Sequence, residues 1–233
     1  MFSNLVAFVP MLGAVAVFCA YLMLCGGLIA WALRARGFAF FTVAIPAGFA
    51  AIAVAQVGTH FIKLPWSPLL PLGVSIVTAL LLGVAASFFA KKAPKPEKQT
   101  LQKWLQGIIA VIVLAAIYAI TFVRALKEPT VISQTFDGNF HLNLADVFAA
   151  RGSVDPFSVD LSSPGSNKFY PSLWHACVVL IMQMSGLTVD VATNALTIVA
   201  ASLVWSTGMI ALVRLLLGNK KIVQVAAVLG CIA

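Results

Sequence analysis

Carboxylate, imidazole and amide side chains are concentrated in one stretch of a chain that is otherwise largely apolar. Six of the seven acidic residues lie between Glu128 and Asp190, and two of the three histidines lie there as well. A carboxylate beside an imidazole can act as a general base with the residue that orients it, or as two ligands of a metal ion. We therefore expect the chemistry of the protein in this stretch.

The spacing of Asp137 and His141 favours a shared site. A helix is predicted over residues 137–151, with Asp137 as its N-terminal cap and Gly152 as the residue that ends it. Residues four apart lie on one face of a helix, so Asp137 and His141 could act together in catalysis or bind one metal ion. The simpler interpretation is that Asp137 only caps the helix and His141 is a surface residue.

The polar face of this predicted helix could recognise a substrate. Asn139, Asn143 and Asp146 lie on it, and amide and carboxylate groups suit the hydroxyl groups of a sugar, although such a face can also be merely solvated. The opposite, apolar face is formed by Phe140, Leu144, Val147 and Phe148. An amphipathic helix beside membrane spans usually lies in the interface between lipid and water, and we expect this one there.

Aromatic and basic residues flank the same stretch. Tyr170, Trp174 and His175 stand at the start of a short apolar segment over residues 171–186. Tyrosine and tryptophan are common anchors at a membrane surface, but their rings could equally stack on a sugar. Arg151 could hold a phosphate group, or it could be an ordinary solvated charge of the loop.

The remaining composition is that of a membrane protein. Hydrophobic residues make up 61% of the chain and charged residues 9%, whereas soluble domains carry about 25% charged residues. Several apolar runs reach the length of about 20 residues that a bilayer-spanning helix needs. We therefore expect an all-α, polytopic transmembrane helix bundle.

Five spans are predicted, over residues 5–33, 38–57, 69–90, 105–123 and 191–217. Residues 171–186 are short for a span and are interpreted as a juxtamembrane helix, with a full crossing as the alternative. A further apolar run, 222–233, is interpreted as the start of another span, so that the chain is the N-terminal part of a longer protein. Residues 1–104 then form three spans with a basic linker, and residues 105–233 a second module.

The net charge of +8 comes mainly from connections between the apolar runs. These connections contain Arg34 and Arg36, five lysines between residues 91 and 103, and Lys220 and Lys221. The positive-inside rule places them in the cytoplasm, and the N-terminus and the loop 124–170 outside a bacterial plasma membrane. Charge in this pattern argues against a nucleic-acid partner and for a lipid bilayer.

Two segments together resemble the GT-C class of integral membrane glycosyltransferases. They are residues 135–143 (TFDGNFHLN) and 169–175 (FYPSLWH). More narrowly, they resemble a family of uncharacterised actinobacterial multipass proteins allied to that class, over about residues 135–218. The chain departs from the class because four spans precede the large loop and no acidic residue stands two positions from Asp137.

The resemblance implies that a sugar passes from a polyprenyl-phosphate donor to a cell-envelope glycan or protein acceptor at the outer membrane face. It implies that Asp137 is the general base on the acceptor hydroxyl, and that His141 is its neighbour or, with Asp137, a ligand of a divalent metal ion, Mg²⁺ or Mn²⁺. The alternative is a non-catalytic assembly or binding subunit of the membrane. A transporter is less favoured, because the centres of the spans hold almost no ionisable residues.

Overall fold

The computed structural model describes residues 6–89, 101–161, 165, 168–218 and 220–232. These residues are helical, apart from their connections and one isolated antiparallel bridge between Val159 and Lys168. The helices are α2 (Val9–Ala32), α3 (Phe38–Ile62), α4 (Leu69–Phe89), α5 (Leu101–Leu126), α6 (Phe136–Arg151), α7 (Leu173–Ser185), α8 (Val189–Ile198), α9 (Trp205–Leu217) and α10 (Lys221–Ile232), with a π-helical segment, η1 (Val199–Val204), between α8 and α9.

Five helical stretches are long and apolar enough to cross a membrane, as predicted. They are Val9–Ala32, Phe38–Ile62, Leu69–Phe88, Leu105–Leu126 and Val189–Leu217. The last is continuous through α8, η1 and α9. The predicted end of the second span at residue 57 is wrong, because α3 continues to Ile62 and therefore carries His60 in its last turn.

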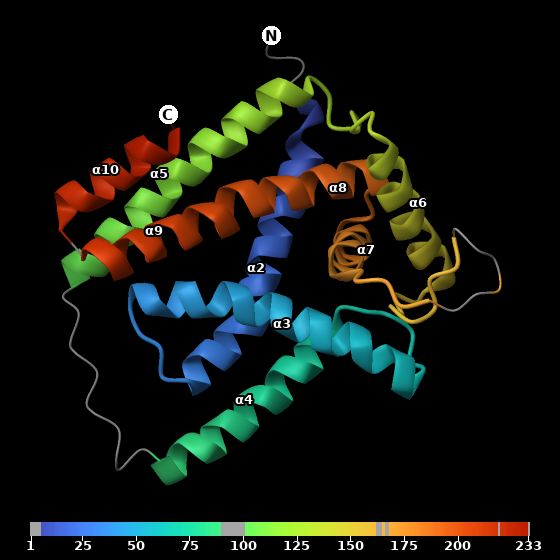
Figure 1. Ribbon diagram of the computed structural model, residues 1–233, viewed down its shortest axis with the longest axis horizontal. Coiled ribbons are helices and arrows are strands. Elements are labelled where there is room, and N and C mark those ends of the chain that lie inside the picture. The colour runs from blue at the N-terminus through green and yellow to red at the C-terminus, as the bar shows by residue number, and fades with distance from the viewer. Residues whose placement is uncertain (1–5, 90–100, 162–164, 166–167, 219, 233) are drawn as a thin grey trace.

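One end of the bundle gathers the loops that hold the acidic residues. The backbone N–H of Trp66, in the connection after α3, donates to the carbonyl of Gly152 at 2.8 Å. The Gln183 side chain, on α7, donates to the carbonyl of Trp66 at 3.0 Å. The connection after α3 and the end of α6 therefore lie on the same side, where α5 also ends (Figure 1).

The opposite end gathers the basic connections of the described residues. Phe38, at the start of α3, forms a small core with Ala110, Val111 and Ile210. The Arg214 guanidinium lies 4.4 Å from the centre of the Phe38 ring. Since Arg34 and Arg36 precede α3, and Lys220 and Lys221 follow α9, these basic residues share one end, as the charge rule requires.

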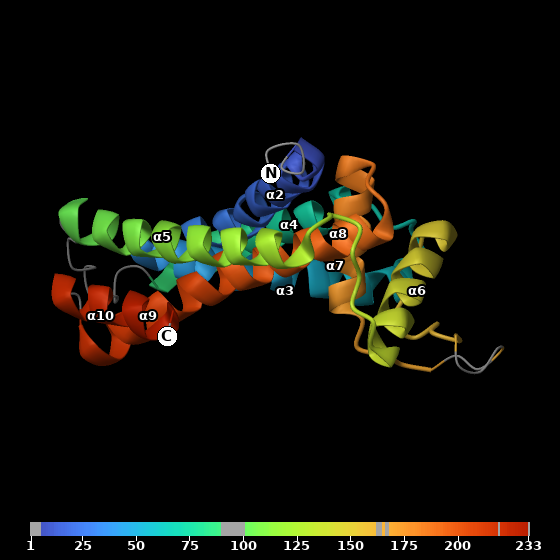
Figure 2. The same ribbon diagram turned by 90° about the horizontal axis from the view of Figure 1, so that it is seen from above.

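α7 is surrounded by other helices. Seven consecutive residues, from His175 to Ile181, are at most 2% exposed. Consecutive residues point to all sides of a helix, so protein must cover α7 all round, and α2, α3, α6 and α8 do so. Figure 1 looks nearly along the axis of α7, and Figure 2 shows it upright while α5 runs across the view. The predicted short helix is present, but protein rather than lipid covers it.

The apolar face of α6 is also buried in protein. Leu144, Ala145 and Phe148 are at most 2% exposed, and α6 packs against α7 and α8. The expectation that this face rests on the lipid surface is therefore wrong, because α7 takes the place that lipid was expected to fill.

Two glycines set the distance between α2 and α3. A Cβ atom on Gly26 would lie 1.7 Å from the carbonyl oxygen of Ala44, and one on Gly48 would lie 2.7 Å from that of Leu22. Only a residue without a side chain permits this approach, which is how small residues act between membrane helices.

Replacement of Gly26 tests this contact. Gly26→Ala should lower the free energy of unfolding by about 2 kcal/mol or more, because the two helices must separate. Gly13→Ala, on the same helix and with no atom within 4 Å of the added Cβ, is the matched control and should not destabilise. Thermal unfolding of both variants in detergent measures the difference, and equal melting temperatures would contradict the close approach.

Candidate functional site

Asp137 lies in the first turn of α6, and its carboxylate does not cap the helix. The N-terminal cap is Thr135, whose side-chain oxygen accepts a hydrogen bond from the Gly138 N–H at 3.1 Å. The predicted capping role of Asp137 is therefore wrong, and Asp137 lies exposed in the first turn. The predicted helix end is confirmed, since Gly152 has the positive φ of 62° that suits glycine after a helix.

His141 and His175 meet between α6 and α7. The Nδ1 atom of His141 lies 3.0 Å from the Nε2 atom of His175, and either imidazole can donate, depending on its tautomer. Tyr170 and Trp174 surround the pair, with ring centres 5.2 to 6.5 Å from the two imidazoles. Phe148 closes the inner side, 6.2 Å from the His175 ring.

Burial makes His175 the neutral member of this pair. It is 2% exposed, and burial is the largest cause that lowers its pKa, to about 4, from an ordinary 6.5. The charge of His141 lowers the pKa further, while a backbone contact with Ser172 acts in the opposite direction. Near neutral pH, His175 therefore carries no charge and can hold the ring of His141 in one orientation.

The polar face of α6 is exposed. Asp137, Asn139, Asn143 and Asp146 point outward, and none of them forms a hydrogen bond or ion pair with a described residue. Asp137 thus shares α6 with His141 but does not contact the histidine pair. The carboxylate and amide groups remain available to a hydroxyl-bearing ligand.

Arg151 has a partner that the sequence did not predict. One of its guanidinium nitrogens lies 3.0 Å from a carboxylate oxygen of Asp160, and both side chains are partly exposed. Surface ion pairs of this kind contribute only about 0–1 kcal/mol, so Arg151 can exchange Asp160 for a phosphate at little cost.

Asp137 and His141 were also predicted to bind a divalent metal ion. No three His, Cys, Asp or Glu side chains converge within the described part of the chain. Asp137 offers one carboxylate, and the Nδ1 atom of His141 already faces His175. Mg²⁺ is often held by one or two carboxylates together with substrate phosphates, and Asp137 would supply one such ligand. We assign no chemical step to a metal.

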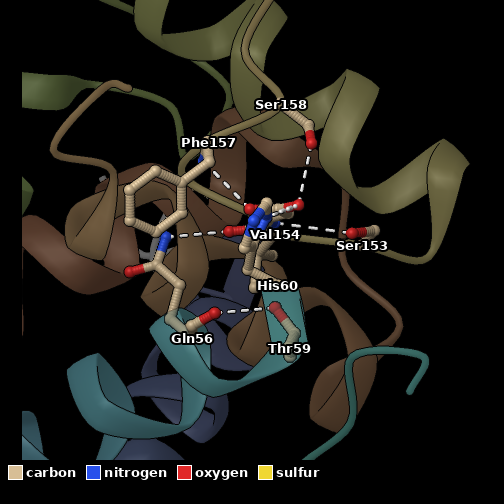
Figure 3. Close-up of polar contacts among 8 residues, drawn as sticks. Gln56, Thr59, His60, Ser153, Val154, Phe157 and Ser158 are labelled. Atoms are coloured by element: carbon tan, nitrogen blue, oxygen red, sulfur yellow. Dashed lines mark hydrogen bonds and ion pairs between the residues drawn. The ribbon is translucent and has the colours of Figure 1, made fainter. Parts of the chain in front are cut away.

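A second polar cluster lies at the end of α3. Figure 3 shows Gln56 and His60 of α3 facing the loop that follows α6. His60 Nδ1 lies 2.9 Å from a carboxylate oxygen of Asp155, which is 7% exposed. The same carboxylate accepts hydrogen bonds from the Phe157 N–H at 2.9 Å and from the Ser158 hydroxyl at 2.7 Å. Burial raises the pKa of Asp155, but these three hydrogen bonds outweigh it, and the net pKa lies below the ordinary value.

Gln56 connects this cluster to the start of α7. Its side-chain nitrogen donates to the Val154 carbonyl at 3.0 Å and to the Ser172 hydroxyl at 2.7 Å. Ser172 immediately precedes α7, three residues before His175. The sequence alone does not reveal this cluster, because its members are about a hundred positions apart. A glutamine inside an apolar span was the available signal, since polar groups there need a partner.

The helical spans and the polar loop cluster together define a polytopic membrane protein with a candidate site at one end of its bundle. Residues 19–233 match a family of unknown function (DUF6541), and the chain belongs to this family. Comparisons with curated proteins and with solved structures give no match.

The buried histidine predicts a loss of stability in mild acid. Below pH 6.5 the unfolded chain protonates residue 175, whereas the folded protein resists until about pH 4, so acid favours unfolding. Relative to His175→Phe, the wild-type protein should lose about 1.6 kcal/mol of unfolding free energy between pH 6.5 and pH 5. Denaturant titrations in detergent at the two pH values measure this, and parallel behaviour of both proteins would contradict the burial of an uncharged imidazole.

Proposed function

We propose that the protein is a membrane glycosyltransferase that takes a sugar from a polyprenyl-phosphate donor. The acceptor is a glycan or protein of the cell envelope, and transfer occurs at the extracytoplasmic face of a bacterial plasma membrane. One observation carries the proposal: the two segments that resemble the GT-C class, 135–143 and 169–175, meet through His141 and His175 at 3.0 Å.

The position of this meeting point suits a lipid-linked donor. α6 and α7 lie at the end of the bundle where the loops after α3 and α6 contact each other. The exposed face of α6 is open to a water-soluble acceptor, while the spans beside α7 would face the hydrocarbon chain of the donor. A site that joins two such substrates must lie at the boundary between lipid and water.

The proposed reaction needs a base for the acceptor. The acceptor oxygen attacks the anomeric carbon, the bond from that carbon to the phosphate oxygen breaks, and polyprenyl phosphate leaves with the electron pair. Asp137 takes the proton of the acceptor hydroxyl. His141 lies one helical turn further along, held by the neutral His175, and adds a hydrogen-bonding group beside Asp137.

Neighbouring side chains bind the sugar and the phosphate. Asn139, Asn143 and Asp146 offer amide and carboxylate groups to sugar hydroxyls. Arg151 binds the phosphate after leaving its surface partner Asp160. Tyr170 and Trp174 flank the histidine pair and present aromatic rings to the sugar.

Replacement of Asp137 tests the proposed base. Asp137→Ala in the full chain should reduce transfer from a radiolabelled polyprenyl-phosphate sugar by at least about 100-fold, as loss of a general base does. Glu128→Gln, an exposed carboxylate outside α6, should retain normal transfer. Equal transfer by the wild-type protein and Asp137→Ala, with both proteins folded, would exclude the assignment.

The exposed polar face of α6 favours one second candidate, a non-catalytic assembly subunit that docks a partner there. This candidate predicts that Asn139→Ala with Asn143→Ala loses a protein partner in pull-down experiments, whereas Asp137→Asn changes nothing. The apolar stripe of α6 cannot serve as the docking surface, since Leu144 and Phe148 are buried. Transfer activity that depends on Asp137 would reject this candidate.

A further inference from the structure

The end of α3 presents an imidazole beside a row of aromatic rings. We propose that this end carries a sugar-binding subsite, in which His60 accepts a hydrogen bond from a sugar hydroxyl and neighbouring phenylalanine rings cover the apolar face of the sugar. The identity of the ligand rests on the proposed function, and the subsite adds to that function a place where a sugar is held apart from the α6–α7 contact.

Asp155 fixes the direction of the His60 ring. Its carboxylate faces Nδ1 of His60 at 2.9 Å, so in the neutral imidazole Nδ1 carries the proton and Nε2 carries the lone pair. The carboxylate cannot turn away, because the Phe157 N–H and the Ser158 hydroxyl also donate to it. An oriented hydrogen-bond acceptor loses little conformational entropy when a ligand arrives.

The Nε2 atom of His60 is accessible to a ligand. The His60 side chain is 35% exposed, and Nε2 forms no hydrogen bond with a described residue. Asp155, in contrast, is buried, so the pair consists of a buried carboxylate and an imidazole that a ligand can reach.

Aromatic rings continue from His60 across the surface. The His60 ring centre lies 5.1 Å from that of Phe61 and 4.7 Å from that of Phe157, and Phe157 lies 5.2 Å from Phe169. Phe61 is 72% exposed and Phe169 is 61% exposed. Rings of this kind can stack on the C–H groups of a sugar while the imidazole contacts a hydroxyl.

A polar ligand suits this row better than an acyl chain does. An imidazole nitrogen without a partner would be costly in hydrocarbon. The exposed ion pair of Arg151 with Asp160, and Lys168 directly before Phe169, place charges in the same loop. These charged groups favour an aqueous neighbourhood for the rings.

Binding of simple sugars by the full chain in detergent tests the subsite. The probes are the methyl glycosides of glucose, galactose, mannose and N-acetylglucosamine, observed by saturation-transfer NMR. At least one should receive saturation from aromatic protons. His60→Phe, which keeps a ring but removes the acceptor, and Phe169→Ala should each weaken that binding at least about tenfold.

Asp155→Asn tests whether sugar binding depends on the orientation and tautomer of the His60 ring and not only on its packing. Its amide can donate to Nδ1 and so move the imidazole proton to Nε2, the tautomer change that disables the same pairing in serine proteases. Binding should again weaken about tenfold, while Trp31→Ala, an aromatic residue 66% exposed at the opposite end of the bundle, should bind as the wild-type protein does. If His60→Phe fails to fold, the exposed Phe169 still decides the question.

The subsite would be overturned if none of the glycosides binds, or if His60→Phe and Phe169→Ala bind them as the wild-type protein does. It would also be overturned if Phe169→Ala changes only insertion into phosphatidylglycerol vesicles, because the aromatic row would then be a lipid anchor. Glycoside binding without sugar transfer would reject the proposed function and keep the subsite. Transfer without glycoside binding would reject the subsite alone.

Discussion

A polar side chain buried among apolar residues must find a partner, and Gln56 meets this requirement by bonding to residues outside its own helix. Its amide nitrogen donates to the loop at Val154 and to Ser172 at the start of α7. An unpaired amide in such surroundings would cost several kcal/mol, so the loop and α7 cannot move away from α3 independently. These two bonds thereby tie the loop beside Asp155 and the start of α7, which carries His175, to the end of α3.

Complete burial of α7 has a chemical as well as a mechanical effect. The helix brings an imidazole into a place that water does not reach, and burial then removes its charge near neutral pH. A second, partly exposed imidazole on α6 is thereby paired with an uncharged neighbour. The site consequently combines a rigid inner residue with an outer face on which Asp137 and the two asparagines remain free to meet a ligand.

The sequence predicted which segments form helices better than it predicted what covers the faces of those helices. Hydropathy and length identified the five spans, and Gly152 identified the end of α6, because these features depend on local composition. His60 and Asp155 were missed as a pair because their contact joins positions 95 residues apart. The surroundings of α6 and α7 were predicted wrongly for a related reason: an apolar face indicates burial but does not reveal whether lipid or another helix covers it.

The residue that caps the start of α6 could not be predicted from residue types alone. Asp137 and Thr135 are both good N-terminal caps, and only the backbone decides which of them takes that place. The sequence therefore predicted the start of α6 to within one turn, but it could not show that the carboxylate of Asp137 makes no contact that holds the helix.

The π-helical segment η1 has a consequence for the whole fifth span. Buried residues recur along it roughly every four positions, at Ala195, Val199, Ser202, Ser206, Ile210 and Arg214. In a regular α-helix this stripe would drift by about 100° around the axis between Ala195 and Arg214. The wider turn of η1 absorbs one extra residue and so cancels this drift. Arg214 can therefore stand over the Phe38 ring at one end of the bundle while α8 still presents its inner face to α7 at the other.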